Sequence, residues 1–411
     1  MPGLKSKPIK VAVVFGTRPE AIKMAPVVKE LQQYPEEIIT RVAVTAQHRQ
    51  MLDQVLDLFK IVPDFDLNIM KQQQTLFDIT TQALTGLGQV FAKDRPDLVL
   101  VHGDTTTTFA GSLAAFYHQI PVGHVEAGLR THDKYSPYPE EMNRHLTGVI
   151  ADLHFAPTAT SRANLLREGI APDKIYVTGN TVIDALLATV RPDYRFQGEL
   201  SEIVRRNSEL ERTAAGNQRS SGEGQDFVWR EATSRVTGSR RLILVTTHRR
   251  ENLGDPLREV YLAFRDLLDT FPDIELVFPV HKNPRVREVV EQVLGGLARV
   301  HLIEPLDYEP FANLMNYATL VLTDSGGLQE EAPALGKPVL VLRDTTERPE
   351  AVEAGTVKLV GTNRESVYQT ARELLANPAE YDKMARAINP YGDGQAARRT
   401  VLAIRHYFGL T

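Results

Sequence analysis

The chain of 411 residues contains no cysteine. This absence excludes disulfide bonds, thiolate catalysis and cysteine-ligated zinc sites, and it is consistent with a reducing compartment. No segment approaches the ~18 consecutive apolar residues that a membrane-spanning helix needs. The opening segment MPGLKSKPIK is not followed by an apolar run of signal-peptide length. We therefore expect a cytoplasmic protein with no membrane partner.

The sequence also lacks a strong excess of either charge. Its 47 Lys and Arg against 52 Asp and Glu give a net charge of −5, without a basic block. This balance argues against a nucleic-acid partner. Hydrophobic residues make up 42% of the chain, as in ordinary globular proteins. At this length one hydrophobic core is insufficient, so two domains are expected.

Short apolar runs alternate with helical patterns along most of the chain. In the first half the expected strands are residues 9–15, 41–45, 65–70, 98–101, 121–125, 153–157 and 175–178. In the second half they are residues 242–246, 274–279, 300–302, 320–323, 338–342 and 357–360. Such alternation predicts an α/β fold made of two doubly wound, Rossmann-like parallel sheets. We expect the two domains to face a cleft lined by their strand ends.

Composition changes set the expected domain boundaries. Residues 1–190 form the N-terminal domain, and residues 242–385 form the C-terminal domain. Between them, residues 191–241 form a linker that includes the polar stretch ERTAAGNQRSSGEGQ. This stretch cannot bury much apolar surface, so we predict a mobile insertion. Residues 386–411 form a helical tail that we expect to pack back on the N-terminal domain.

Carboxylates follow two successive strands of the first domain. Asp104 ends the segment LVLVHGD, and Glu126 ends the next strand, VGHVE. A loop with Glu140, Glu141 and Arg144 is expected after them. Since ligands bind at the carboxyl ends of parallel strands, these carboxylates should share one crevice. They suit proton transfer or metal binding, while Asp104 alone can also serve as a helix N-cap.

Two segments have the form of phosphate-binding turns. GTRPE places Arg18 at a helix start after the first strand, where helix N–H groups and a guanidinium can bind an anion. The G-x-G-x-x-G dinucleotide motif is absent there. Ser325-Gly326-Gly327 starts another helix, with Glu331 one turn later to accept from ribose hydroxyls. The alternative for both segments is a plain strand-to-helix turn.

Two histidines follow strands of the second domain. His248 is followed by Arg249 and Arg250, and His281 is followed by Lys282. These neighbours suit a phosphate ligand or a proton-transfer residue. Neither histidine has metal-ligand spacing, so we expect no metal. From the residues alone, the chain is predicted to be an enzyme acting on a phosphate-bearing sugar.

Eight segments together are more specific than any one of them. They are GTRPEAIKMAPV, TAQHRQMLDQVL, VHGDTTTTFAGSLAAFY, PVGHVEAGLRT, SPYPEEMNR, THRRENLG, HKNP and TDSGGLQEEAPALGKPVLVLRDTTERPEAV. With them the chain resembles the non-hydrolysing UDP-N-acetylglucosamine 2-epimerases over nearly its whole length, except residues 191–241. The resemblance implies the glycosyltransferase-B fold, a homodimer, and no cofactor. It implies interconversion of UDP-N-acetylglucosamine and UDP-N-acetylmannosamine for cell-surface polysaccharide.

The mechanism implied by the resemblance is elimination and re-addition. Removal of the C2 proton and loss of UDP from C1 give a 2-acetamidoglucal, and UDP then adds back with a proton on the other face of C2. Both faces need a proton carrier, which accounts for several carboxylates in one crevice. Three alternatives stay open: a hydrolysing epimerase that releases N-acetylmannosamine, a glycosyltransferase of the same fold, and a non-enzymatic nucleotide-sugar sensor.

The resemblance also assigns roles, residue by residue. The implied catalytic residues are Asp104, Glu126, Glu140 and His248, the histidine acting on the diphosphate side. The implied UDP or substrate contacts are Arg18, Arg144, Phe311, Ser325, Gly326, Gly327 and Glu331. A second, activating UDP-N-acetylglucosamine site is implied at Gln47, Gln50, Glu140, Arg249 and His281. Gln73 stands where the family has an arginine, which weakens the expectation of activation.

Overall fold

The computed structural model describes residues 7–46, 49–71, 73–204 and 240–410. The chain divides into two units. Unit 1 comprises Met1–Ala188 and Pro390–Thr411, and unit 2 comprises Thr189–Asn389. The helix at residues 198–204 lies in the predicted linker, and the polar stretch ERTAAGNQRSSGEGQ lies wholly outside the described residues.

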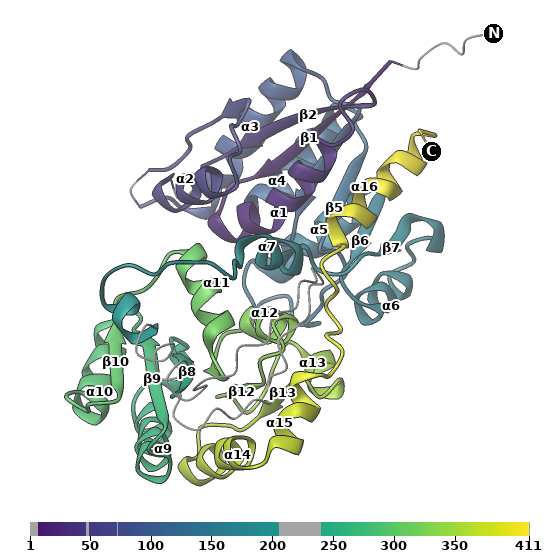
Figure 1. Cartoon of the computed structure of the whole chain (residues 1–411). Helices are drawn as coiled ribbons and strands as arrows, with labels where there is room; N and C mark the ends of the chain where they lie inside the picture. The colour runs from purple at the N-terminus through teal and green to yellow at the C-terminus, as the bar shows by residue number, and fades with distance from the viewer. Residues whose placement is uncertain (1–6, 47–48, 72, 205–239, 411) are drawn as a thin grey trace, which may run out of the picture. The chain divides into compact units, whose positions relative to one another are not determined.

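Unit 1 is built on a parallel sheet (Figure 1). Its strands are β1 Ile9–Phe15, β2 Ile38–Val44, β3 Phe65–Asp66, β4 Leu98–His102, β5 Val122–Val125, β6 Leu153–Ala156 and β7 Ile175–Val177. In the described part of the unit they form one seven-stranded sheet of order β3-β2-β1-β4-β5-β6-β7. This order is that of a doubly wound fold, as predicted from the alternation of strands and helices.

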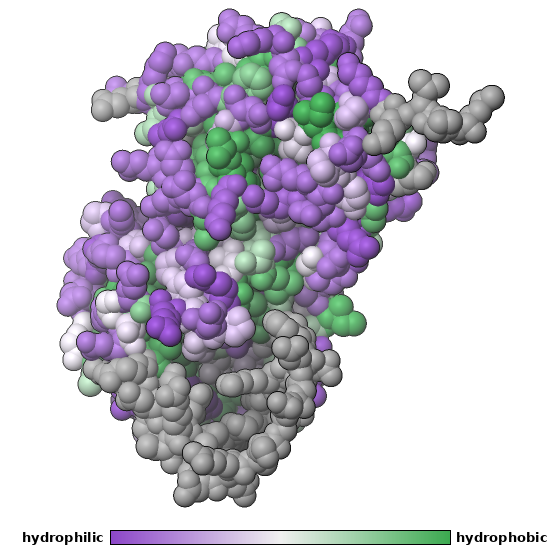
Figure 2. Space-filling model, turned by 45° about the horizontal axis from the view of Figure 1, so that its top comes forward, coloured by the Kyte–Doolittle hydropathy of each residue, from purple (hydrophilic) through white to green (hydrophobic). Residues whose placement is uncertain are grey.

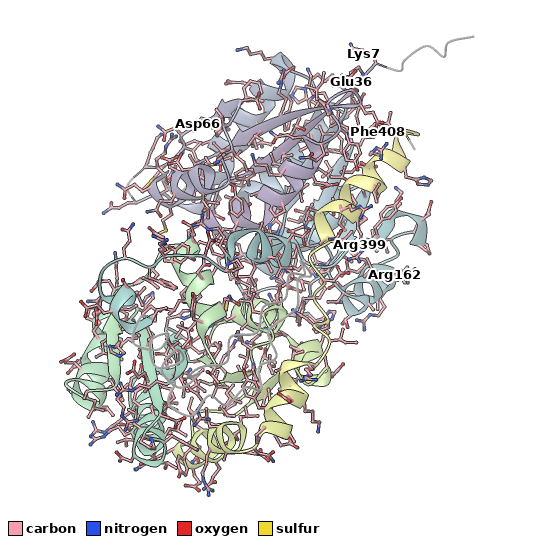
Figure 3. All side chains as sticks on the ribbon, in the orientation of Figure 1. Lys7, Glu36, Asp66, Arg162, Arg399 and Phe408 are labelled. Atoms are coloured by element: carbon pink, nitrogen blue, oxygen red, sulfur yellow. The ribbon has the colours of Figure 1, made fainter. Side chains whose placement is uncertain are left out.

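Helices connect the strands of unit 1. They are α1 Arg18–Leu31, α2 Arg49–Leu58, α3 Leu76–Lys93, α4 Thr106–Tyr117, α5 Glu140–Ile150, α6 Ala159–Arg167 and α7 Thr181–Thr189. The last helix, α16 Ala396–Tyr407, packs on α1 of the same unit. Figure 3 labels Arg399 and Phe408 near its two ends. Arg405 forms a two-pronged ion pair with Glu37 at 2.8 and 3.1 Å, and this pair fixes α16 on unit 1.

Unit 2 repeats the architecture. Its strands are β8 Arg241–Thr246, β9 Ile274–Pro279, β10 Val300–Ile303, β11 Leu320–Thr323, β12 Val339–Val341 and β13 Val357–Leu359. Their order in the described residues is β10-β9-β8-β11-β12-β13, again all parallel. The helices are α9 Asp255–Thr270, α10 Pro284–Leu294, α11 Tyr308–Tyr317, α12 Leu328–Ala334, α13 Pro349–Glu353, α14 Arg364–Ala376 and α15 Pro378–Ala385.

The central strands are buried on both faces. All residues of Leu98–His102 are buried, and so are the four residues of Leu320–Thr323. Continuous apolar runs of this kind are typical of parallel sheets covered by helices on both sides. The face shown in Figure 2 is mostly hydrophilic where the structure is described. No helix among the described residues is long and apolar enough to cross a membrane.

The helix that follows β4 begins inside the threonine run. α4 starts at Thr106, the second of four consecutive threonines. The reason is local capping, because the Thr105 hydroxyl accepts a hydrogen bond from the Thr108 N–H at 3.1 Å. A threonine run is a poor helix former in isolation, so the cap and the buried packing of α4 decide its start.

Candidate functional site

The predicted site residues gather at one place in each sheet. In unit 1 the strand order reverses between β1 and β4, which are paired neighbours. The turn with Arg18 follows β1, and the turn with Asp104 follows β4. In unit 2 the order reverses between β8 and β11, followed by His248 and Ser325. Ligands of doubly wound sheets bind at such reversal points.

Asp104 is not a helix cap. The N-cap of α4 is Thr105, so the Asp104 carboxylate is left for other contacts. Arg144 Nη2 lies 2.7 Å from Asp104 Oδ2. Asn143 Nδ2 also donates to the Asp104 carbonyl oxygen at 2.9 Å. This geometry favours the site interpretation over the capping interpretation.

The environment of Asp104 raises its pKa to about 6. Partial burial is the largest cause, and the charges of Glu126 and Glu140 add to it, whereas Arg144 and Lys23 lower the pKa. A carboxyl group with a pKa near neutrality is suited to proton transfer. The charges of the other two predicted acids, Glu126 and Glu140, therefore act on Asp104 within unit 1.

The raised pKa has a measurable cost in stability. Because the pKa of Asp104 is about 6 in the folded state and about 4 in an unfolded chain, the folded state loses stability as pH rises from 4 to 6. Asp104→Asn removes this penalty. We expect its free energy of unfolding, relative to the parent protein, to be higher at pH 8 than at pH 4 by about 1–3 kcal/mol. Urea unfolding at both pH values measures it, and an equal difference at both would contradict it.

Glu126 is held by donors at the end of β5. Its backbone has a positive φ of 62°, and its side chain is only 7% exposed. The carboxylate accepts a hydrogen bond from Asn180 Nδ2 at 2.7 Å and forms an ion pair with Lys23. His102 Nε2 lies 3.4 Å away, and burial lowers the pKa of His102 to about 4, which leaves it neutral. A cation and an amide donor favour the ionised form of Glu126.

Sequence reasoning missed both Lys23 and Asn180. Lys23 lies on α1, little more than one turn after Arg18, and its position in GTRPEAIK was the available signal. Asn180 lies in the turn that follows β7 and belongs to none of the motifs singled out in the sequence. Its partner Glu126 is 54 residues away in sequence, a pairing that no local pattern contains.

The expected loop around Glu140 was wrong. Glu140, Glu141 and Arg144 lie on α5, whose first residue is Glu140. The sequence does not indicate this helix because charged side chains lie on its buried face and apolar ones on its exposed face. Glu141 and Arg144 are buried, whereas Met142 and other apolar side chains are exposed. An apolar stripe facing the core is the usual sign of a helix, and it is absent here.

Glu141 anchors the arginine that contacts Asp104. Its carboxylate accepts from the backbone N–H of Thr131 at 3.1 Å and of His132 at 3.0 Å. Arg144 Nη1 lies 3.5 Å from it. Burial by itself raises the pKa of Glu141, but these N–H donors and Arg144 outweigh it and lower the pKa. An ionised Glu141 therefore keeps Arg144 in place beside Asp104.

The turn with Arg18 is tightly packed. Arg18 is the first residue of α1 and is half-buried, and no ion pair or hydrogen bond engages its side chain within the described part of the chain. A Cβ on Gly16 would lie 2.0 Å from Thr45 Oγ1 and 2.6 Å from Thr107 Oγ1. Glycine is therefore required for this turn to approach the neighbouring strands.

Gly16→Ala is expected to destabilise unit 1. The added methyl group must displace Thr45 and Thr107, and overpacking of this kind costs about 1–3 kcal/mol. Because the turn also presents Arg18, binding of an anionic ligand at this turn should weaken as well. The matched control is Gly88→Ala in α3, which has room for a Cβ and should gain about 0.5–1 kcal/mol. Urea unfolding of both variants measures the effects, and a Gly16→Ala variant as stable as the parent would contradict the account.

In unit 2 the buried Asp324 organises the turn after β8. Its Oδ2 accepts from the backbone N–H of His248 at 2.8 Å and of Arg249 at 2.9 Å. His248 Nδ1 lies 3.0 Å from Oδ1. Burial raises the pKa of Asp324, but His248 and the backbone N–H groups outweigh it, so the pKa is lowered. In the sequence Asp324 directly follows an expected strand, and no local pattern predicts that it supports His248.

Cations lie beside the glycine turn of unit 2. A Cβ on Gly326 would lie 3.7 Å from Arg249 Nη2 and 3.4 Å from Glu347 Oε2. Glu347 is also 3.8 Å from Arg249. The imidazole rings of His248 and His281 are 5.8 Å apart, so the two predicted histidines do come together. The turn thus lies beside a guanidinium and two imidazoles, groups that can bind an anion.

Glu331 lies at the other side of this turn. Its Oε1 would be 3.4 Å from a Cβ on Gly327. The hydroxyl of Tyr308 is beside Glu331, and burial together with the charge of Glu331 raises the pKa of Tyr308. Phe311 is one helical turn beyond Tyr308 on α11. The helix geometry therefore places the predicted aromatic contact in the neighbourhood of the predicted ribose contact.

The predicted activating site stays a prediction. Gln47 lies outside the described residues. Gln50 is exposed on α2 of unit 1, whereas Arg249 and His281 belong to unit 2. Gln73 is exposed and has a positive φ of 56°.

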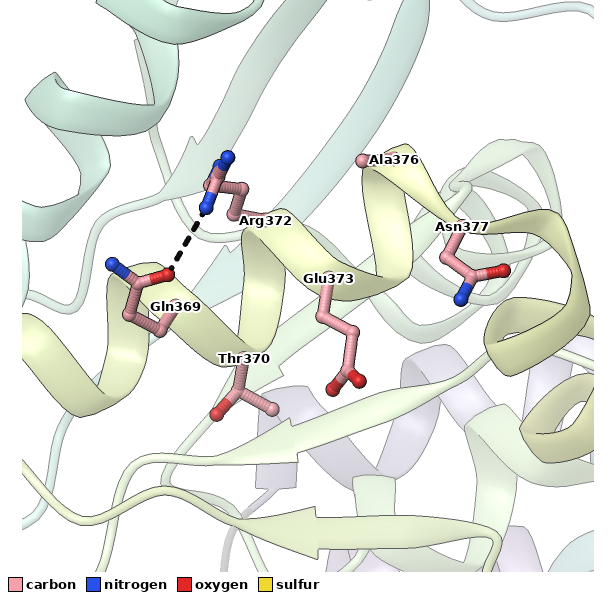
Figure 4. Close-up of a pocket in the computed structure, with 6 residues that line it drawn as sticks. All are labelled: Gln369, Thr370, Arg372, Glu373, Ala376 and Asn377. Carbon is pink, nitrogen blue, oxygen red and sulfur yellow. Dashed lines mark hydrogen bonds between the residues drawn. The ribbon is translucent and has the colours of Figure 1, made fainter.

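Other candidate sites carry little chemistry. A surface depression on α14 is lined by Gln369, Thr370, Arg372, Glu373, Ala376 and Asn377 (Figure 4). This helix contributes none of the site residues described above. No group of three or more His, Asp or Glu side chains in the described ranges is arranged to hold a metal ion.

Comparison with known proteins decides the family. The model of the UDP-N-acetylglucosamine 2-epimerase family matches residues 29–405. The chain belongs to this family. A UDP-N-acetylglucosamine 2-epimerase of Bacillus subtilis is 57% identical over 403 residues, which cover 98% of this chain and 97% of that protein. The family resemblance seen in the motifs is thereby confirmed.

Solved structures of other family members have the same fold. A putative UDP-N-acetylglucosamine 2-epimerase from Listeria monocytogenes has a TM-score of 0.86 at 52% identity, covering 98% of each chain. A UDP-GlcNAc 2-epimerase from Neisseria meningitidis, solved bound to UDP-GlcNAc, has a TM-score of 0.78 at 50% identity. That match covers 97% of this chain and 100% of the other. Two parallel-sheet α/β units of the glycosyltransferase-B type are therefore confirmed for this UDP-N-acetylglucosamine 2-epimerase family member.

Proposed function

We propose that the chain is a non-hydrolysing UDP-N-acetylglucosamine 2-epimerase, which interconverts UDP-N-acetylglucosamine and UDP-N-acetylmannosamine. Family membership supports epimerisation of this nucleotide sugar. The observation that carries the mechanism is the cluster of carboxylates in unit 1, in which Asp104 has a pKa of about 6 beside Glu126 and Glu140. A reaction that removes a proton from one face of a carbon and returns it to the other needs two such proton carriers.

The reaction proceeds by elimination and re-addition. A carboxylate takes the C2 proton, the C1–O bond breaks, and its electron pair leaves with UDP. A double bond between C1 and C2 then remains, which makes the intermediate a 2-acetamidoglucal. UDP adds back to C1, and C2 takes a proton on its opposite face. Glu126, whose ionised form is favoured by Lys23 and Asn180, is suited to accept a proton, and Asp104 is suited to hold one.

Stabilisation of the leaving UDP is the second requirement. The C2 proton is weakly acidic, so charge that develops on the diphosphate must be met by positioned donors. Arg18 at the α1 start, His248 beside Asp324, and Arg249 beside the glycine turn are the groups we assign to this task. The Neisseria meningitidis relative bound to UDP-GlcNAc supports the choice of ligand. Phe311 is assigned to the uracil and Glu331 to the ribose.

Three further expectations belong to this proposal. They are a homodimer, activation by a second molecule of UDP-N-acetylglucosamine, and supply of N-acetylmannosamine units for cell-surface polysaccharide. None of them is needed for the chemistry at the carboxylate cluster, so each can fail without affecting the epimerase assignment.

Product analysis tests the proposal. Purified protein is incubated with UDP-N-acetylglucosamine, and nucleotide sugars and free sugars are separated and quantified over time. We expect a stable mixture of the two UDP sugars, with free UDP as a minor species. Accumulation of N-acetylmannosamine with equal UDP would identify a hydrolysing enzyme instead. No reaction without an added sugar acceptor, followed by transfer once an acceptor is present, would identify a glycosyltransferase.

A further inference from the structure

Glu20 is a buried carboxylate that the proposed chemistry does not use. It lies in the first turn of α1 and is 2% exposed. Its Oε2 accepts from the backbone N–H of Gly16 at 3.0 Å and of Thr17 at 2.8 Å. Thr17 in turn caps the helix, so the two residues form a reciprocal capping box. This part of the arrangement explains only how α1 begins.

The other oxygen of Glu20 leaves its own helix. Glu20 Oε1 accepts from the hydroxyl of Thr105 at 2.7 Å and lies 3.2 Å from the hydroxyl of Thr108. Thr105 is the N-cap of α4 and directly follows Asp104. One carboxylate therefore joins the turn that presents Arg18 to the turn that presents Asp104. The joined turns follow β1 and β4, which are paired neighbours in the sheet.

A second contact joins the residue after β2 to the start of α4, next to the Arg18 turn. Thr45 Oγ1 and Thr107 Oγ1 are 2.9 Å apart, and both crowd the space beside Gly16. The phosphate-binding turn is thus packed between β2 and the start of α4, with no room for a methyl group. Because these contacts are close and buried, a displacement of the Arg18 turn also displaces the start of α4.

The capping box at the start of α3 is exposed, unlike that of Glu20 at the start of α1. In α3, Asp78 accepts from the N–H of Thr75 at 2.9 Å, and the Thr75 hydroxyl accepts from the N–H of Asp78 at 3.2 Å. Both residues are exposed, and these hydrogen bonds stay within one helical turn. A capping box therefore does not require burial. Burying a carboxylate is costly unless several donors surround it, and the donors around Glu20 come from two elements.

We propose that Glu20 is a positioning residue, which holds the phosphate-binding turn of Arg18 and the turn of Asp104 in one fixed arrangement. The inference rests on the proposed function, because it gives these turns the tasks of binding the diphosphate and moving the C2 proton. Those two events belong to one elimination step, so their geometry must be set together. Burial raises the pKa of Glu20 more than the hydrogen bonds from Thr105, Gly16 and Thr17 lower it. These donors engage both oxygens of Glu20, so an amide, which has only one acceptor oxygen, cannot replace the carboxyl group without losing a contact.

The first test compares Glu20→Gln with the matched control Asp78→Asn. Each variant replaces the acid of one capping box by its amide, so the loss of helix capping is similar. We expect Glu20→Gln to lower kcat by about 10–100-fold, since a displacement near 1 Å can cost 10²-fold. KM should rise by a smaller factor, and Asp78→Asn should leave kcat within about 2-fold. Equal kcat values for the two variants, at temperatures where both are folded, would overturn the proposal.

The second test needs no turnover and separates this proposal from the proposed function. Amide hydrogen exchange is measured on peptides that cover residues 16–20 and 103–108. We expect Glu20→Gln to speed exchange in both peptides, because the link between the turns is lost. Faster exchange at 16–20 alone would reduce Glu20 to a capping residue and overturn the proposal. If Glu20→Gln speeds exchange in both peptides but the parent protein has no epimerase activity, the proposed function is refuted while the link between the two turns is supported.

A second pair of variants keeps the proposal testable if Glu20→Gln fails to fold. Thr105→Ser keeps the hydroxyl that donates to Glu20, whereas Thr105→Ala removes it. We expect the serine variant to retain the parent kcat within about 3-fold and the alanine variant to fall with Glu20→Gln. Equal activity of the serine and alanine variants would contradict the proposed link.

Discussion

Asp104→Asn is expected to lower kcat for epimerisation by about 10²–10⁴-fold, the usual contribution of a general acid or base. The amide keeps the shape of the side chain and can still accept from Arg144, which lies 2.7 Å from the carboxylate. It cannot exchange a proton with C2. UDP is assigned to other residues, so its affinity should change by less than about 3-fold. Initial rates by nucleotide-sugar separation and UDP titration by calorimetry measure the two quantities.

The control for this variant is Asp57→Asn, which changes an exposed carboxylate of α2 in the same unit. It should have the kcat and the UDP affinity of the parent protein. Near-normal turnover by Asp104→Asn would remove Asp104 from the mechanism. Loss of UDP binding by the same variant would place Asp104 on the diphosphate instead of the sugar.

Asp324→Asn is expected to affect both stability and turnover. The buried carboxylate accepts from two backbone N–H groups and lies 3.0 Å from His248 Nδ1. An amide has one acceptor oxygen, and its NH₂ group faces a donor. We expect the free energy of unfolding to fall by about 2–3 kcal/mol, because two backbone N–H groups and His248 lose a charged, buried acceptor. Turnover should fall by at least about 10-fold as His248 loses its support.

The loss of stability in Asp324→Asn should depend on pH, and the direction of that dependence follows from the pKa of Asp324. The pKa of Asp324 is lowered in the folded state, so its contribution to stability is present above the unfolded pKa near 4 and is lost at lower pH. The difference between parent and Asp324→Asn should therefore shrink as pH falls below about 4. Urea unfolding followed at pH 3 and pH 7 measures it, with the exposed Asp269→Asn as the control. A difference that is constant with pH would contradict the ionised state of Asp324.

Much of the fold could be predicted from the sequence because buried parallel strands have a local signature. β4 is an uninterrupted apolar run, and the polar triplet His102-Gly103-Asp104 marks its end. The rule that ligands bind at strand ends then places Asp104 and Glu126 together without any knowledge of the packing. The neighbouring pairing of β4 with β5 agrees with that prediction.

The rest of the site depends on contacts between residues far apart in the sequence, which no local pattern predicts. Lys23 and Asn180 reach Glu126 from α1 and from the turn after β7. The sequence does not indicate α5 as a helix because its core-facing side is charged. That burial is stabilised by the pairing of Arg144 with Asp104 and Glu141 and by backbone N–H donors to Glu141. The sequence predicts the capping role of Glu20, because its partner Thr17 is local. It does not predict the contact of Glu20 with Thr105, which is 85 residues away.

The central claim is that a carboxylate of unit 1 breaks the C2–H bond of the sugar. Proton NMR of the purified protein with UDP-N-acetylglucosamine in deuterated water tests it most directly. The account predicts UDP-N-acetylmannosamine with deuterium at C2, deuterium in the recovered substrate, and no accumulation of free sugar. Formation of UDP-N-acetylmannosamine that retains its original hydrogen at C2 would contradict the account.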